Sequence, residues 1–140
     1  FYPSNFMEES FKRATFMVNV MQTNDLPPIC PHMDNTSGHN LAATIYLNNE
    51  NECAGGTSFY TFGGRTFYSD PTVTHTYDVE GRLPVTSYIN DSIHDWEMIG
   101  MVPMQFNRMV LYNQAMLHSA YVKPGMFTDN VYRLNQQFFI

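Results

Sequence analysis

The feature that most restricts the fold of this chain is a series of short apolar runs that alternate with turn-forming residues. Two such runs, residues 41–47 and 57–62, are closed by a polar turn and by a glycine pair. Four more follow one another toward the end of the chain, at residues 98–104, 107–113, 117–122 and 131–139. Short strands separated by Gly, Pro and Asn predict an all-β sandwich or jelly roll.

Two other stretches have a different pattern. Residues 4–17 carry apolar side chains at helical spacing with charged residues between them, which predicts one short N-terminal helix. Residues 65–95 are rich in polar residues and turn formers, and we expect a long excursion from the barrel with a strand at 73–77. Prolines at 27, 28 and 31 exclude helix in the stretch that contains them. The chain of 140 residues fits one domain, 1–140.

Charge and cysteine content narrow the partners and the compartment. The formal net charge is −6 with only seven Lys and Arg, so there is no basic face for nucleic acid. No apolar run approaches the roughly 20 residues that a membrane span needs. Cys30 and Cys53 do not form a disulfide framework. We therefore expect two reduced thiols in a cytoplasmic protein with no nucleic-acid or membrane partner.

His32-Met33-Asp34 is the first candidate site in the chain. On an extended strand, residues i and i+2 point to the same face, so this nitrogen and this carboxylate can hold one cation together. A second imidazole would complete two histidines and one carboxylate. That ligand set leaves open coordination positions and is the facial triad of non-haem Fe(II) oxygenases.

His118 is the best candidate for the second imidazole. It lies in the predicted strand 117–122, directly after another apolar strand, whereas His39, His75 and His94 lie in polar stretches and are expected to be surface or structural residues. A histidine that points into a β-barrel needs a partner for its ring nitrogens. A metal ion is one such partner, and a buried hydrogen bond is the alternative.

These elements occur in an order that resembles the Fe(II)/2-oxoglutarate-dependent dioxygenases, most closely the prolyl-hydroxylase-like branch. The similarity covers about residues 27–140 and rests on five features in sequence order. They are His32-x-Asp34, the strand end Tyr46-Leu47-Asn48, the Gly55-Gly56-Thr57 element, the two strands that lead to His118, and Val122-x-x-Gly125 followed by Arg133. The resemblance implies a double-stranded β-helix (jelly roll), Fe(II) on His32, Asp34 and His118, 2-oxoglutarate as cosubstrate, and O2.

The family anchors the far carboxylate of 2-oxoglutarate on a Lys or Arg about ten residues after the distal histidine. Here Arg133 follows His118 by 133 − 118 = 15 residues, and Lys123 by only five. We favour Arg133, because Arg133-Leu134-Asn135 resembles the Arg-x-Ser element of some members and a guanidinium suits a carboxylate. Gln22 replaces the tyrosine that the branch often places upstream of His-x-Asp. Four further residues are candidates for cosubstrate contact: Thr44, Tyr46, Tyr112 and Asn135.

The resemblance implies a hydroxylase that converts 2-oxoglutarate to succinate and carbon dioxide while it hydroxylates a carbon atom. A peptidyl, prolyl-like side chain is the first expected substrate. A small metabolite is the second, and a non-catalytic metal-binding jelly-roll module is the third possibility. The excursion at 65–95 is expected to cover the substrate, as long loops on rigid scaffolds commonly do.

Overall fold

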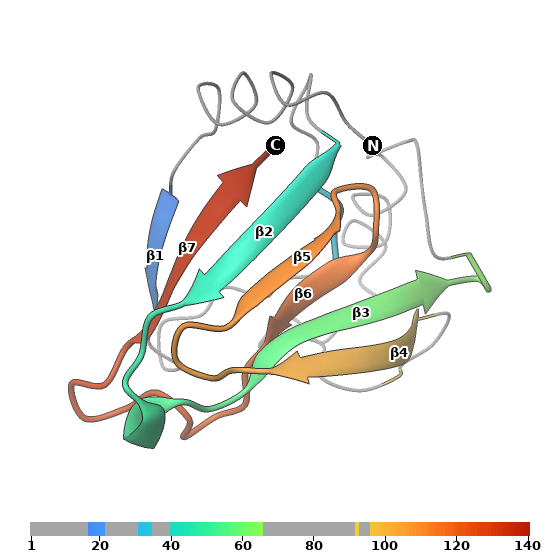
Figure 1. Cartoon of the computed structure of the whole chain (residues 1–140). Coiled ribbons are helices and arrows are strands. Elements are labelled where there is room, and N and C mark those ends of the chain that lie inside the picture. Colours follow the sequence, from blue (N-terminus) through green and yellow to red (C-terminus); the bar gives the residue numbers. More distant parts are fainter. Residues whose placement is uncertain (1–16, 22–30, 35–39, 66–91, 93–95) are drawn as a thin grey trace, which may run out of the picture.

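The structure, a computed structural model, describes residues 17–21, 31–34, 40–65, 92 and 96–140. Its strands form two antiparallel sheets that lie in two layers (Figure 1). The four-stranded sheet has the order β1-β7-β2-β5, and the three-stranded sheet has the order β4-β3-β6. The strands are β1 (Met17–Met21), β2 (Leu41–Tyr46), β3 (Gly56–Phe62), β4 (Trp96–Pro103), β5 (Met109–Asn113), β6 (His118–Tyr121) and β7 (Arg133–Phe139).

The architecture of the described residues is mostly β, which confirms the all-β class predicted from the sequence. All six apolar runs are strands, with ends that differ by one or two residues from those predicted. The prediction was wrong at Met17. It was expected to be the last residue of the helix 4–17, but it is the first residue of β1, a strand that was not predicted. The rest of that helix and the strand at 73–77 lie outside the described residues. Among the described residues, no helix is long and apolar enough to cross a membrane.

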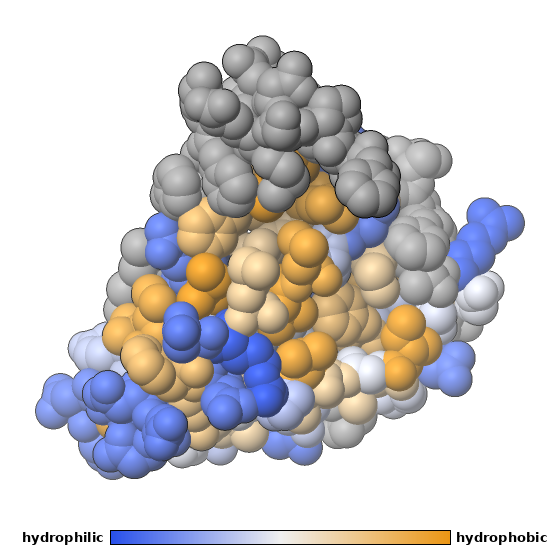
Figure 2. Space-filling view, viewed as in Figure 1, coloured by the Kyte–Doolittle hydropathy of each residue, from blue (hydrophilic) through white to orange (hydrophobic). Residues whose placement is uncertain are grey.

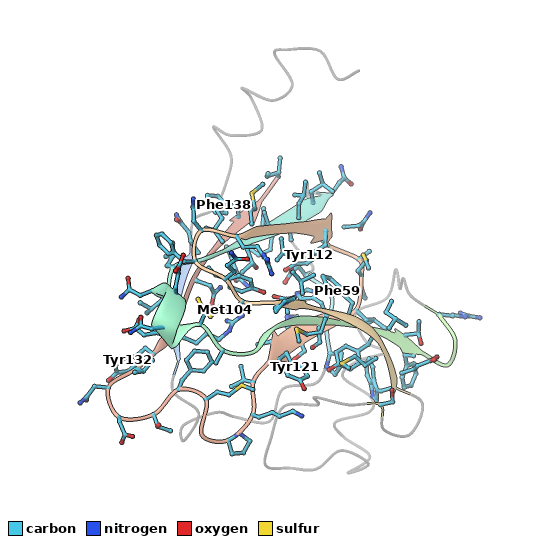
Figure 3. The ribbon with its side chains drawn as sticks, turned by 60° about the horizontal axis from the view of Figure 1, so that its bottom comes forward. Phe59, Met104, Tyr112, Tyr121, Tyr132 and Phe138 are labelled. Atoms are coloured by element: carbon cyan, nitrogen blue, oxygen red, sulfur yellow. The ribbon has the colours of Figure 1, made fainter. Side chains whose placement is uncertain are left out.

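The core lies between the two sheets. On β5, Val110 and Tyr112 point inward and are buried, while Met109 and Leu111 point outward and are exposed. Figure 3 shows Tyr112 of β5 turned toward Phe59 of β3, and their rings meet edge to face at 5.5 Å. The two-residue alternation of a strand therefore gives the four-stranded sheet an inner face that carries the site and a separate outer face.

The outer face of the four-stranded sheet is apolar. Leu41, Met109 and Leu111 are exposed by 37%, 58% and 52%. Figure 2 shows apolar residues gathered over β2 and β5 on this side of the molecule.

Two glycines set the start of β3 against its neighbours. Gly55 has a φ of +67°, and a side-chain carbon there would lie 2.0 Å from the Tyr121 carbonyl oxygen. A side-chain carbon on Gly56 would lie 2.1 Å from the Val102 carbonyl oxygen. Only glycine allows the backbone to approach β6 and β4 this closely. The Gly-Gly pair thereby places the next residue, Thr57, on the inner face opposite β2.

Trp96, the only tryptophan, is a core residue at the start of β4. It is 1% exposed, and its ring packs against Tyr60 and Phe62 at centroid distances of 6.4 and 4.8 Å. Trp96 therefore has a packing role.

Candidate metal centre

Backbone pairing brings the two halves of the candidate site together. His32 and His118 form an isolated antiparallel bridge, in which each backbone N–H donates to the carbonyl oxygen of the other at 2.8 Å. The residues around His32 therefore continue the three-stranded sheet beyond β6. Residues directly opposite on antiparallel strands share a face, so both imidazoles lie on the same side. The Asp34 N–H donates to the Gln114 carbonyl oxygen at 2.9 Å, which fixes the carboxylate two positions along.

The three predicted ligands form one cluster. One ligand atom from each of His32, Asp34 and His118 lies within 4.8 Å of the other two. His118 Nε2 lies 3.4 Å from Asp34 Oδ2, and His32 Nε2 lies 3.9 Å from Asp34 Oδ1. Metal–ligand bonds of about 2.1 Å require ligand atoms roughly 3 to 4 Å apart. The donor set therefore fits a metal ion after only small side-chain rotations.

The three side chains of the cluster differ in exposure. The exposed fraction of the side chain falls from 44% at His32 to 11% at Asp34 and 5% at His118. His32 is therefore the outermost of the three candidate ligands, and His118 is the most deeply buried.

His118 is held in the form that a metal needs. Its Nδ1 lies 2.9 Å from the Met116 carbonyl oxygen, and since a carbonyl only accepts, Nδ1 carries the hydrogen. Nε2 is left with its lone pair directed at the cluster. Burial, together with the neighbouring His32, lowers the pKa of His118 to about 4, against the opposing effects of Asp34 and the Met116 carbonyl. A neutral imidazole fixed by its second nitrogen is the usual state of a metal-binding histidine.

Tyr112 joins the cluster from the other sheet. Its hydroxyl donates to Asp34 Oδ2 at 3.3 Å and lies 3.2 Å from His118 Nε2. Its ring lies 4.6 Å from the His118 ring, centroid to centroid. The Thr44 hydroxyl also hydrogen-bonds to it. Burial, followed by the charge of Asp34, raises the pKa of Tyr112 above its ordinary value, so the phenol keeps its proton.

Arg133 is buried at the first position of β7. Its guanidinium donates from Nη1 to Asn135 Oδ1 at 2.5 Å and from Nη2 to the Gly56 carbonyl oxygen at 3.4 Å. It also lies over the Tyr46 ring, 5.8 Å from the centroid. Arg133 and Asn135 are 5% and 1% exposed, so this cation is enclosed between the sheets.

Hydroxyl groups surround this cation on its β2 and β3 sides. Tyr46 and Thr57 share a hydrogen bond of 2.6 Å between their hydroxyl oxygens, and both residues are buried. Burial raises the pKa of Tyr46, against the lowering effects of the Thr57 hydrogen bond and Arg133. Thr44, two residues before Tyr46 on the same face of β2, is also buried. The predicted cosubstrate residues therefore fall into two groups. Tyr46 and Asn135 contact Arg133. Tyr112 lies beside the metal ligands, and Thr44 contacts Tyr112.

The sequence offered Lys123 as an alternative to Arg133, and three other histidines as alternatives to His118. Lys123 lies in the loop just beyond the end of β6, with its ammonium 5.3 Å from the Tyr121 ring centroid. His39, His75 and His94 lie outside the described residues.

Three contributions were missed from the sequence. The Asn48 side chain donates to the Tyr132 carbonyl oxygen at 2.6 Å and accepts from the Leu134 N–H at 2.7 Å, so it holds the backbone on both sides of Arg133. The others are the Met116 carbonyl and the Thr57 hydroxyl. Only Asn48 gave a signal, because an asparagine directly after a buried strand commonly bonds to backbone.

A comparison with protein-family models shows which family the chain belongs to. Residues 5–133 match the model of DUF6445, a family of unknown function, and the chain is a member of it. No curated protein and no solved structure matches the chain.

Proposed function

We propose that this protein is an Fe(II)- and 2-oxoglutarate-dependent oxygenase that hydroxylates a peptidyl side chain. The observation that carries the proposal is the cluster of His32, Asp34 and His118, whose ligand atoms lie within 4.8 Å of one another. Two imidazoles and one carboxylate that leave other coordination positions open are characteristic of non-haem Fe(II) oxygenases.

The strand order supports the jelly-roll part of the proposal. If the residues around His32 count as a strand beside β6, the three-stranded sheet gains a fourth member, and each sheet has four. Along the chain, β1 lies in one sheet, His32 in the other, β2 in the first and β3 in the second. An eight-stranded double sheet of this kind is the architecture of jelly rolls.

The enclosed cation supports the cosubstrate part. Arg133 offers a planar fork of donors that matches a carboxylate, with the Tyr46 and Thr57 hydroxyls beside it. Tyr46 and Thr44 are two strand positions apart, about 6.6 Å, and Thr44 contacts Tyr112 beside the metal ligands. That separation suits a five-carbon diacid with four C–C bonds of about 1.5 Å.

In this scheme each group of the chain has a defined task. His32, Asp34 and His118 hold the iron, which when bound supplies the oxygen chemistry with 2-oxoglutarate as co-reductant. Arg133 binds and orients the distal carboxylate. Met116 keeps His118 neutral and its Nε2 directed inward. The buried hydroxyl and aromatic side chains between the sheets exclude bulk water from the reacting centre.

The first test separates cosubstrate binding from iron binding. Replacing Arg133 by Gln should raise the 2-oxoglutarate requirement at least tenfold while Fe(II) affinity stays within about twofold, because in this proposal the guanidinium binds the distal carboxylate and not the iron. Lys123→Ala is the control and should leave both values unchanged. If Lys123→Ala raises the 2-oxoglutarate requirement and Arg133→Gln does not, the assignment of Arg133 as the residue that binds the distal carboxylate is wrong.

The second test addresses the substrate. Succinate formation should be measured with Fe(II), 2-oxoglutarate and ascorbate against a panel of proline-containing peptides and a panel of small metabolites. The proposal predicts stimulation by peptides. Stimulation by metabolites alone would move the proposal to a small-molecule hydroxylase, and no turnover with either panel, in protein that binds iron, would favour a non-catalytic metal-binding module.

A further inference from the structure

The Tyr112 hydroxyl lies between the side chains of two of the metal ligands. It lies 3.3 Å from Asp34 Oδ2 and 3.2 Å from His118 Nε2, and those two atoms lie 3.4 Å apart. The three atoms thus form a nearly equilateral triangle. The hydroxyl has one hydrogen to donate, and both neighbours are acceptors.

Metal binding changes which acceptor is available. Since Nδ1 of His118 carries the hydrogen that bonds to Met116, Nε2 holds a lone pair that accepts from Tyr112 in the metal-free protein. A bound metal uses that same lone pair, so Nε2 ceases to be an acceptor. Asp34 Oδ2 is then the acceptor that remains for the Tyr112 hydroxyl within this triangle.

We propose that Tyr112 is the positioning residue of the metal centre. In the metal-free protein its hydroxyl shares its hydrogen bond between His118 and Asp34. When metal occupies the centre, the hydroxyl bonds to Asp34 Oδ2 alone and leaves one carboxylate oxygen, Oδ1, to face the ion. A carboxylate that binds the ion through one oxygen occupies one coordination position, so more positions stay open for other ligands.

The surroundings of Tyr112 suit such a role, because they hold its oxygen in place. The ring packs edge to face on Phe59 and also lies against His118, and the residue is 6% exposed. The Thr44 hydroxyl, on the neighbouring strand β2, also hydrogen-bonds to the phenol. Partners of this kind around a metal centre typically change metal affinity 10- to 100-fold.

The inference rests on the metal site of the proposed function but not on 2-oxoglutarate. Its test is a titration with Co(II) in the absence of cosubstrate, read by the visible Co(II) spectrum and by the dissociation constant. Tyr112→Phe keeps the packed ring and removes only the hydroxyl, so Co(II) affinity should fall 10- to 100-fold. The spectrum should change as well, because the carboxylate is free to bind through both oxygens.

Tyr121→Phe is the matched control, because it also removes a tyrosine hydroxyl, but one that takes no part in the hydrogen bonds among Tyr112, Asp34 and His118. It should leave Co(II) affinity unchanged. Thr44→Val should give a smaller loss than Tyr112→Phe. Circular dichroism of each variant checks that the fold is retained.

Two results from the comparison of Tyr112→Phe with the wild type would overturn the inference. One is equal Co(II) affinity and an unchanged spectrum in Tyr112→Phe. The other is an intense visible band in the Fe(III)-loaded wild type that Tyr112→Phe lacks, because that band would make Tyr112 a direct ligand. If the Co(II) results hold but 2-oxoglutarate never binds, the oxygenase proposal fails and the role of Tyr112 stands. If the wild type binds no Co(II), both the oxygenase proposal and the role of Tyr112 fail.

Discussion

At the scale of single residues, the centre depends on keeping His118 neutral in a buried place. The Met116 carbonyl accepts from Nδ1, and the side chain is 5% exposed. Protonating the buried His118 ring removes a charge from water, and attraction to Asp34 offsets only part of this cost. The pKa of His118 is therefore lowered. A neutral ring is free to bind metal at neutral pH, without first losing a proton.

This lowered pKa predicts the pH dependence of stability in the metal-free protein. The pKa of His118 is 6.5 in the unfolded chain and about 4 in the folded one, so between these values the unfolded state binds more protons. The contribution of His118 is therefore fully present above pH 6.5 and is lost as the pH falls toward 4. Urea unfolding from pH 7.5 to 4 should reveal this slope.

His118→Gln is the comparison for that measurement, since glutamine does not titrate. The stability difference between the two proteins should shrink as the pH falls below 6.5. A difference that stays constant from pH 7.5 to 4 would show that His118 titrates normally in the folded state.

Asn48 illustrates how one side chain fixes the position of another. Asn48→Ala leaves the Leu134 N–H and the Tyr132 carbonyl without these two hydrogen bonds. Because Asn48 is 1% exposed, we expect a loss of about 2–4 kcal/mol in the free energy of unfolding, from two bonds of about 1–2 kcal/mol each. Asn49→Ala is a close control, because Asn49 is exposed and contacts Glu52 at 3.4 Å. Equal stability of the two variants would contradict this role.

At the scale of elements, the strands of the site were predictable where an apolar run ends at turn formers and unpredictable where pairing was distant. β5 is such an apolar run, although its burial alternates and the sequence does not show which of its side chains point inward. β1 was not predictable, because its five residues follow a helix-like stretch and it pairs with β7, more than 110 residues away. Tertiary pairing of this kind overrides local propensity.

The same distinction applies to the site residues. His32, Asp34 and His118 were predictable, since ligand type and two-residue spacing are properties of the sequence. The Met116 carbonyl was not, because every residue has one and only the folded backbone selects it. The hydroxyl pair of Tyr46 and Thr57 joins different sheets and also needed the structure.

The start of β3 gives a prediction at this scale. Gly56→Ala would place a methyl group 2.1 Å from the Val102 carbonyl oxygen, so β3 and β4 must separate there. We expect a loss of about 1–3 kcal/mol by overpacking and a weaker Arg133 environment, since Gly56 contacts Arg133. Gly100→Ala, in the paired strand, meets nothing within 4 Å and should change stability by less than about 0.5 kcal/mol. Similar thermal midpoints for the two variants would contradict the close approach.

At the scale of the whole molecule, the centre joins parts of the chain that are far apart in sequence. His32 and Asp34 come from the segment that extends one sheet, His118 from β6 and Tyr112 from the other sheet. An ion bound to His32, Asp34 and His118 cross-links two segments that are far apart in the sequence, and the Tyr112 hydrogen bond to Asp34 joins this centre to the other sheet, so metal binding stabilises more than one loop.

That cross-link predicts stabilisation by metal. Binding to the folded state alone adds about 2.7 kcal/mol when the metal concentration is 100 times the dissociation constant. Thermal unfolding with Co(II), which replaces Fe(II) without oxidation, should therefore shift the midpoint upward by several degrees. Asp34→Asn and His118→Ala should show little or no shift. An equal shift in these variants would place the metal elsewhere.

The measurement that tests the central claim most directly is anaerobic addition of Fe(II) and then 2-oxoglutarate to the wild type, followed by visible absorption. Chelation of the keto acid by iron at the facial triad should give a weak charge-transfer band that requires both components. His118→Ala should lack the band, and Arg133→Gln should need more 2-oxoglutarate to reach it. A folded wild type that gives no band at saturating Fe(II) and 2-oxoglutarate would contradict the oxygenase assignment.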